Sequence, residues 1–324
     1  MIELQGITKT FRVARRSGGM KEAVKALFRR EYTLVQALKD VSFTIGDGEM
    51  VGYIGPNGAG KSSTIKIMSG ILTPDSGTCV INGCTPWKDR KRHVKNIGVV
   101  FGQRSQLWWD VPVIDSFELL RDIYRVPEGT YKRNCEELCE TLELSEILRT
   151  PARQLSLGQR MRCEIAASLL HDPEVLFLDE PTIGLDAVSK IAVREFIRRR
   201  NREHGTTVIL TTHDMQDIEA LTERILLIGK GEILLDGSLE ALRQRHAKVR
   251  KITVEYSSGT FPEAAGITPL EAAPGRASFA VDTDVLSVSQ AIAVLTGNAE
   301  VTDLSVQGAS AEELVVSLYE EFHI

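Results

Sequence analysis

The chain has 324 residues, of which 43% are hydrophobic and 26% are charged, and its net charge is −5. This composition is ordinary for a globular protein, and the acidic balance argues against a general nucleic-acid binder. No apolar run reaches the roughly 18 residues of a membrane-spanning helix, so we expect a cytoplasmic protein whose five cysteines are reduced thiols.

The N-terminal part predicts strands over residues 2–13 and 38–54, with a buried strand over 50–54 at the end of the second segment. A basic insertion near residues 14–32 separates the two segments. Its residues 21–30 would place apolar and basic side chains on different faces of a helix. This pattern fits a helix on an anionic membrane surface or a partner, and equally a solvated helix that covers its own domain.

A complete phosphate-binding loop, G-x-x-x-x-G-K-S, follows the strand and precedes a predicted helix over 63–68. Its glycines let backbone N–H groups turn toward one anion, and Lys61 can reach the β- and γ-phosphates. The Ser62 hydroxyl can bind Mg²⁺. The sequence therefore predicts a nucleoside triphosphate site formed by Gly55, Pro56, Asn57, Gly58, Ala59, Gly60, Lys61, Ser62 and Ser63.

Beyond this loop the pattern is helical over 113–148 and 157–170, and then alternates between strand (175–178), helix (188–200) and strand (207–211). Strands that alternate with helices indicate an α/β core built on a parallel sheet.

The strand over 175–178 ends in two acids. Asp179 would hold Mg²⁺, and Glu180 would lie near the γ-phosphate. A carboxylate in that position can polarise the attacking water as a general base.

Four more segments of the sequence match motifs of one protein family. Residues 155–159, Leu-Ser-Leu-Gly-Gln, resemble the LSGGQ motif of ATP-binding-cassette (ABC) ATPases, and 97–103 resemble the Q-loop of that family. Residues 184–186 resemble its D-loop, and 211–214 its switch histidine segment. With the phosphate loop, these motifs stand in the family's order from residue 2 to about 240. The chain thus resembles ABC ATPases, and in particular bacterial exporter ATPases, some of which have an LSLGQ variant.

The resemblance implies an α/β P-loop NTPase fold: a RecA-like core with an antiparallel β-subdomain and a helical subdomain. In this family two cassettes pair head to tail and enclose ATP between the phosphate loop of one and the LSGGQ segment of the other. We therefore expect ATP and Mg²⁺ as cofactors, and a homodimer or paired cassette. The residues that would face the partner's nucleotide are Ser156, Gly158, Gln159 and Asp186.

The resemblance also implies further roles near the γ-phosphate. His213 would hold that phosphate and order the water, and Gln103 would bind Mg²⁺ and sense the phosphate. The predicted catalytic residues are thus Glu180, His213 and Gln103, and the predicted metal ligands are Ser62, Gln103 and Asp179.

Adenine would stack on an aromatic residue near the first strand. Phe11 is the first candidate and Tyr32 the alternative. A longer insertion than in a minimal cassette follows Phe11.

The chain departs from the family pattern at two further places. Leu157 replaces a glycine of LSGGQ, from which we expect an altered shape with retained function. The Q-loop has an extra residue, Gly102, which leaves Gln106 as a competitor of Gln103.

We expect the ATP-binding and ATP-hydrolysing subunit of an ABC transporter at the cytoplasmic face of the membrane. It would drive transport, in the direction of export, through separate integral membrane transporter subunits. The rival is a soluble ABC ATPase that acts on the ribosome or DNA. No long coiled coil and no second cassette support the rival, and we expect no nucleic-acid partner.

Some residues favour structural roles. Trp108 and Trp109 would contact the transmembrane partner or pack in the core. Residues 198–200, three arginines, are expected to form a solvated helix end, and His171 is expected to be a cation at a helix terminus.

The C-terminal part predicts strands over 252–256, 277–281 and 301–306, and helices over 285–295 and 311–322. We therefore predict two domains. The ABC ATPase domain would span 1–243, and a small α+β accessory domain would span 250–324.

Overall fold

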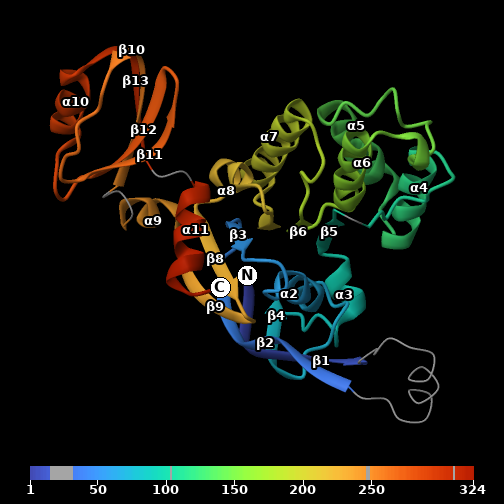
Figure 1. The fold of residues 1–324 in the computed structure, drawn as a ribbon. Helices are drawn as coiled ribbons and strands as arrows, with labels where there is room; N and C mark the ends of the chain where they lie inside the picture. Colours follow the sequence, from blue (N-terminus) through green and yellow to red (C-terminus); the bar gives the residue numbers. More distant parts are fainter. Residues whose placement is uncertain (15–31, 103, 246–248, 309–310) are drawn as a thin grey trace, which may run out of the picture. The chain divides into compact units, whose positions relative to one another are not determined.

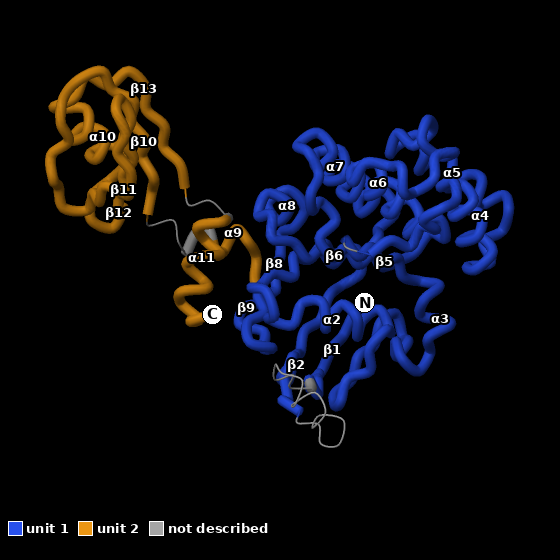
Figure 2. Tube along the Cα trace, turned by 45° about the vertical axis from the view of Figure 1, so that its right-hand side comes forward, with its two compact units in different colours: residues 1–236 blue, residues 237–324 orange. Residues whose placement is uncertain are grey.

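The computed structural model describes residues 1–14, 32–102, 104–245, 249–308 and 311–324. These residues form two compact units, Met1–Asp236 and Gly237–Ile324 (Figure 2). Gln103 and most of the basic insertion, 15–31, lie outside the described residues, together with the predictions made for them. Within the described ranges, no helix has both the length and the apolar character needed to cross a membrane.

The first unit is built on a six-stranded sheet with the order β5-β6-β7-β3-β8-β9 (Figure 1). Its strands are β5 (Ile97–Phe101), β6 (Val175–Asp179), β7 (Thr207–Thr211), β3 (Met50–Ile54), β8 (Arg224–Gly229) and β9 (Glu232–Ser238). The strands from β5 to β8 pair in parallel, which confirms the predicted α/β class. The register places Phe101, Asp179 and Thr211 in one row, so three strands end together at the same edge.

A second, antiparallel sheet has the order β2-β1-β4. It contains β1 (Ile2–Ala14), β2 (Tyr32–Ile45) and β4 (Ser76–Ile81), so β2 begins earlier than the predicted residue 38. Helix α2 (Lys61–Met68) packs against β2, β4 and β6. The same buried core includes Ile2 from β1, Ile65 from α2 and Phe177 from β6, and it therefore joins the two sheets.

Three helices form the helical subdomain: α4 (Val113–Tyr124), α5 (Glu128–Thr141) and α6 (Leu157–Leu169). The predicted helical stretch over 113–148 is interrupted because Arg125 adopts a left-handed conformation (φ 55°) and Pro127 caps the next helix. Helix α6 packs against α4, α5 and β5, which connects the subdomain to the sheet (Figure 1). Among the described residues, the first unit also contains the helices α3 (Arg90–Val94), α7 (Ala187–His204) and α8 (Met215–Leu221) and a short 3-10 helix, Ala152–Gln154.

The second unit has an antiparallel sheet with the order β11-β12-β10-β13. The described part of this unit contains α9 (Leu239–Arg245), β10 (Val249–Gly259), β11 (Ile267–Ala273), β12 (Arg276–Asp282), α10 (Val288–Gly297), β13 (Ala299–Gln307) and α11 (Ala311–Glu321). Residues of β10, β12 and α10 share a small core that includes Ile252, Phe279 and Leu295. Strand β11 was not predicted, because most of its side chains are exposed and it lacks an alternating pattern.

Candidate functional site

The phosphate-binding loop joins β3 to α2, as the sequence predicts. Gly60, the N-cap of α2, has φ 119°, and a Cβ there would lie 2.7 Å from Leu38 Cδ2 and 2.8 Å from the Ala37 carbonyl oxygen. Glycine is therefore required at this turn for two reasons, conformation and space. Asn57 and Gly58 are exposed, so this part of the loop is open to solvent directly before the start of the helix.

Lys61 lies within this loop and is only 7% exposed. Its Nζ donates hydrogen bonds to the carbonyl oxygens of Gly55 and Pro56, the second at 3.1 Å. Burial lowers the pKa of Lys61, and the negative charges of Glu180 and Asp179 oppose that shift. The ammonium group thus stands between the loop and two carboxylates, where an anionic phosphate would add favourable charge.

The carboxylate of Asp179, at the end of β6, interacts with two hydroxyl groups. Ser62 Oγ lies 3.5 Å from Asp179 Oδ2, and Thr211 Oγ1 donates to Asp179 Oδ1. Thr211 is the neighbour of Asp179 in the register of β6 and β7, so the sheet itself brings the two together. Hydroxyl and carboxylate oxygens are ligands that suit Mg²⁺, and these donors therefore fit that ion.

Glu180 follows with a left-handed backbone (φ 56°), which is uncommon for a residue other than glycine. Its N–H donates to the Thr211 carbonyl at 2.8 Å, which holds the turn in place. Glu180 Oε1 lies 3.1 Å from His213 Nε2, so the structure brings together two of the predicted catalytic residues. The imidazole is 47% exposed and the carboxylate 22%, so both remain accessible.

Gly102, the extra residue of the Q-loop segment, packs directly against this turn. Its N–H donates to the Asp179 carbonyl at 2.8 Å, and a Cβ on Gly102 would lie 2.6 Å from the Glu180 carbonyl oxygen. A side chain at this position would therefore displace the loop that holds the two acids.

A cavity of about 280 Å³ lies where these segments meet. Its lining comes from α2, the ends of β5 and β6, and the loops after them. The lining residues are Ser62, Lys66, Ile71, Phe101, Gly102, Arg104, Asp179 and Glu180. The two predicted metal ligands that the structure describes, Ser62 and Asp179, and the predicted general base therefore face one space.

Gln106, the alternative to Gln103, forms hydrogen bonds outside the cavity. Its side-chain Nε2 donates to the Glu164 backbone carbonyl at 2.9 Å, and its N–H donates to Glu164 Oε2 at 3.1 Å. Ser105 Oγ also donates to this carboxylate, and burial raises the pKa of Glu164 against these hydrogen bonds. The segment after residue 103 is thus fastened to α6, and Gln106 does not line the cavity.

The LSLGQ segment forms the N-terminus of α6. Ser156 is the N-cap: its Oγ accepts from Gln159 N–H at 3.2 Å, and its own N–H donates to Gln159 Oε1 at 2.9 Å. Leu157 begins the helix and is 37% exposed. Its side chain lies over the D-loop, because a Cβ on Gly184 would be only 2.4 Å from Leu157 Cδ2. The unusual leucine therefore contacts a second predicted motif.

Asp186 caps the other helix of this region, α7. It accepts hydrogen bonds from Ser189 N–H at 2.9 Å and from Ser189 Oγ at 3.0 Å, and these bonds lower its pKa. A Cβ on Gly158 would lie 3.0 Å from Ser189 Oγ, so the LSLGQ segment and the D-loop are neighbours. The structure brings these motifs together as a second group, apart from the residues that line the cavity.

The two candidates for adenine stacking lie on the β1–β2 hairpin. Phe11 pairs with Val35 in the register, and Lys9 Nζ lies 5.9 Å from the centroid of its ring. Tyr32 pairs with Ala14 and is 53% exposed.

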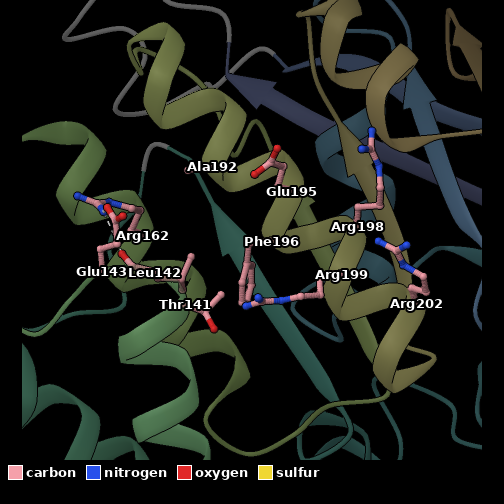
Figure 3. A pocket seen from close by; sticks show the side chains of 10 residues that line it. All are labelled: Thr141, Leu142, Glu143, Arg162, Ala192, Glu195, Phe196, Arg198, Arg199 and Arg202. Atoms are coloured by element: carbon pink, nitrogen blue, oxygen red, sulfur yellow. Dashed lines mark hydrogen bonds and ion pairs between the residues drawn. The ribbon is translucent and has the colours of Figure 1, made fainter.

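A different cavity, of about 470 Å³, contains none of the predicted site residues (Figure 3). Arg199, on α7, lines it, as does Arg162, which forms an ion pair with Glu143 at 3.1 Å. The expected solvated helix end is wrong for Arg200, which is 7% exposed and pairs with Asp172, because α7 continues to His204.

The prediction that His171 is a cation is also wrong. Burial lowers the pKa of His171 to about 4, so the ring is neutral at pH 7. Its Nε2 donates to the Ile97 carbonyl at 2.9 Å, and the ring stacks on Tyr124 with 3.9 Å between centroids.

Comparison with known proteins identifies this arrangement. Residues 38–183 match the family model described as ABC transporter. The ATP-binding protein NatA of Bacillus subtilis is 32% identical over 66% of this chain and 87% of its own length. The daunorubicin resistance ATP-binding protein DrrA3 of Streptomyces coeruleorubidus is 31% identical over 79% of this chain and 78% of its own.

Solved structures agree. The ATP-binding cassette MJ0796, in a dimeric post-hydrolysis state bound to ADP and Pi, is 28% identical, with a TM-score of 0.62 over 74% of this chain and 99% of that one. These relatives do not favour a soluble ABC protein of the ribosome or DNA. The chain therefore belongs to the ATP-binding subunits of ABC transporters, the P-loop ATPases whose hydrolysis of ATP powers transport.

Proposed function

We propose that this subunit binds ATP with Mg²⁺ and hydrolyses it in a head-to-tail homodimer. The dimer drives export through separate integral membrane subunits at the cytoplasmic face of the cell membrane. The observation on which this proposal mainly depends is the row of side chains at the carboxyl ends of β5, β6 and β7, where Glu180 Oε1 lies 3.1 Å from His213 Nε2.

The phosphates bind to the loop of residues 55–60 through its backbone N–H groups, of which every residue except Pro56 has one. The ammonium of Lys61 and the N–H groups of Ser62 and Ser63 complete the site. Ser62 and Asp179 hold Mg²⁺, with Gln103 as a third ligand. When bound, the metal neutralises charge that develops on the phosphates during transfer. The donor chemistry supports this assignment, because the hydroxyl and the carboxylate lie 3.5 Å apart in one cavity.

Glu180 accepts a proton from the attacking water, while His213 donates a hydrogen bond to the γ-phosphate and keeps the carboxylate in position. The turn at Glu180 supports this role, because two backbone hydrogen bonds fix it: from its own N–H to Thr211, and from Gly102 to Asp179. A fixed carboxylate needs little reorganisation at the moment of reaction.

Ser156, Gly158, Gln159 and Asp186 complete the nucleotide site of the second copy. Two observations support this: the exposed N-terminus of α6 is a ready anion site, and the related cassette MJ0796 forms dimers. Adenine stacks on Phe11, with Tyr32 as the alternative.

The membrane subunits contact the surface near Trp108 and Trp109. These adjacent residues are 44% and 49% exposed, and large apolar side chains that gather on a surface mark interaction sites. Export is supported by relatives named for drug resistance, DrrA3 and the linearmycin resistance protein LnrL of Bacillus subtilis.

Replacement of Glu180 by Gln tests the mechanism. We expect Glu180→Gln to lower steady-state hydrolysis by about 10³-fold, since a general base contributes roughly 10²–10⁴-fold. ATP binding remains, and ATP induces a stable dimer visible by size-exclusion chromatography. Glu174→Gln is the matched control, because Glu174 precedes the same strand at its opposite end and should keep the parent rate. Hydrolysis by Glu180→Gln at the parent rate would contradict the assignment.

A further inference from the structure

Asp217, on α8, is a buried carboxylate to which the proposed mechanism gives no role. Its side chain is fully buried and accepts three hydrogen bonds. Asp217 Oδ2 accepts from Thr182 Oγ1 and from Thr212 Oγ1, the latter at 3.0 Å, and Oδ1 accepts from Arg194 Nε at 2.6 Å. Each donor belongs to a different segment of the chain.

Two of these segments hold the predicted catalytic residues. Thr182 lies two positions after Glu180, and Thr212 lies directly before His213. Both hydroxyl groups converge on one carboxylate oxygen, so Asp217 ties the loop after β6 to the loop after β7. Those loops face each other where the Glu180 and His213 side chains lie 3.1 Å apart.

The third donor extends this connection to α7, the helix that begins at the D-loop. Arg194 of α7 bonds Asp217, and its Nη2 also lies 3.4 Å from Asp214 Oδ2. Lys190, one turn earlier on α7, pairs with Asp214, the residue after the switch histidine. Two carboxylates and two cations therefore join α7 to the switch loop.

A buried cluster of charges is weak evidence for a role in net stability. An ion pair in the interior is often no better for stability than apolar residues of the same volume, although removal of one partner alone is costly. The Asp217 carboxylate accepts hydrogen bonds from three segments of the chain, so it constrains their positions relative to one another.

We propose that Asp217 is a positioning residue that holds the loops of Glu180 and His213 in register and couples both to α7. The inference rests on the proposed roles of Glu180 and His213. Since the phosphate loop contributes no donor to this carboxylate, Asp217 governs the rate of hydrolysis and leaves the affinity for nucleotide unchanged.

The test compares Asp217→Asn with Asp172→Asn. Both changes remove the charge of an aspartate that pairs with an arginine of α7, but Asp172 binds Arg200 at the far end of the helix. For Asp217→Asn we expect kcat to fall by roughly 10- to 100-fold, because misplacement by about 1 Å costs up to about 10²-fold. The KM for ATP and the Kd for nucleotide stay within about twofold of the parent values. Asp172→Asn keeps the parent kcat.

A double-mutant cycle with His213→Ala separates positioning from general damage. If Asp217 holds Glu180 and His213 in register, Asp217→Asn lowers kcat by a smaller factor in a His213→Ala background than in the parent. Should Asp217→Asn fold poorly, Thr182→Val and Thr212→Val test the same links by removing single hydroxyl groups, and each lowers kcat without a change in Kd.

Either a parent kcat in all three single variants or losses that multiply in the cycle would overturn this inference alone. If instead His213→Ala itself kept the parent rate, the proposed role of His213 would fail, and the inference that rests on it would fail too.

Discussion

The two halves of the proposed nucleotide cage are built differently. The phosphate half lies at the ends of parallel strands, where the register aligns Asp179 with Thr211 and buries Lys61 beside the acids. The LSLGQ half is a helix N-terminus stabilised by a local capping box, with Ser156 and Leu157 exposed. The first half is therefore set by the whole sheet, whereas the second depends on a few neighbouring residues and on its partner copy.

The largest expected effect comes from breaking both halves in separate copies. Lys61→Ala alone and Ser156→Ala alone each lower hydrolysis by more than about 10²-fold, comparable to loss of a preorganised donor. An equal mixture forms heterodimers with one intact composite site, so roughly a quarter of the parent rate returns if the sites work independently.

ATPase rate against mixing ratio is the measurement. Ser287→Ala is the control for lost capping, because Ser287 and Gln290 form the same capping box at α10. That variant loses about 1 kcal/mol of stability in the second unit but no activity. A mixture that stays as inactive as either parent variant would refute the shared cage.

A smaller effect is expected from Leu157→Gly, which restores the family pattern. Because the Ser156 cap and the backbone N–H groups remain, hydrolysis stays within about threefold of the parent rate. Leu157→Ala separates the lost side-chain contact with Gly184 from the added backbone freedom of glycine. A loss as large as that of Ser156→Ala would show that the leucine itself contacts the nucleotide.

The smallest effect concerns His171. Its ring connects β5, in the sheet of the phosphate half, to α4, in the helical subdomain that carries the LSLGQ half. Its pKa falls from an ordinary 6.5 to about 4 on folding, so the unfolded chain binds a proton between these values and the folded chain does not. Stability contributed by the neutral ring is therefore present above pH 6.5 and is lost as the pH falls toward 4.

Thermal unfolding at pH 7 and pH 4.5 checks this. His171→Gln should reduce the acid-induced fall in Tm by a few degrees, about what 1–2 kcal/mol produces in a unit of this size. His204→Gln, at the exposed end of α7, should leave that fall unchanged. Equal pH dependence in the parent and His171→Gln would contradict the role of burial.

Contiguous motifs made much of this site predictable. The phosphate loop and the two acids at the end of β6 are each recognisable from a few consecutive residues. The structure confirms the strand–loop–helix context around Lys61. The helical stretch predicted over 113–148 missed the break before Pro127, although proline disfavours a helical residue before it.

Other features depend on partners far apart in the chain, which no local pattern shows. Thr182 and Arg194 meet at Asp217 only after β6, β7 and α7 have assembled. In the same way, Arg200 resembles its two exposed neighbours in sequence, and only the fold places Asp172 beside it.

The left-handed turn at Glu180 has a consequence for mutational tolerance. An L-residue in this conformation costs roughly 1–2 kcal/mol, and glycine escapes that cost. A selection for thermostability alone would therefore favour Glu180→Gly, a change that removes the proposed base. At this position stability favours glycine, whereas turnover requires glutamate. A replacement that tests the base should therefore keep the shape of glutamate, so that lost activity is not mixed with a change in stability.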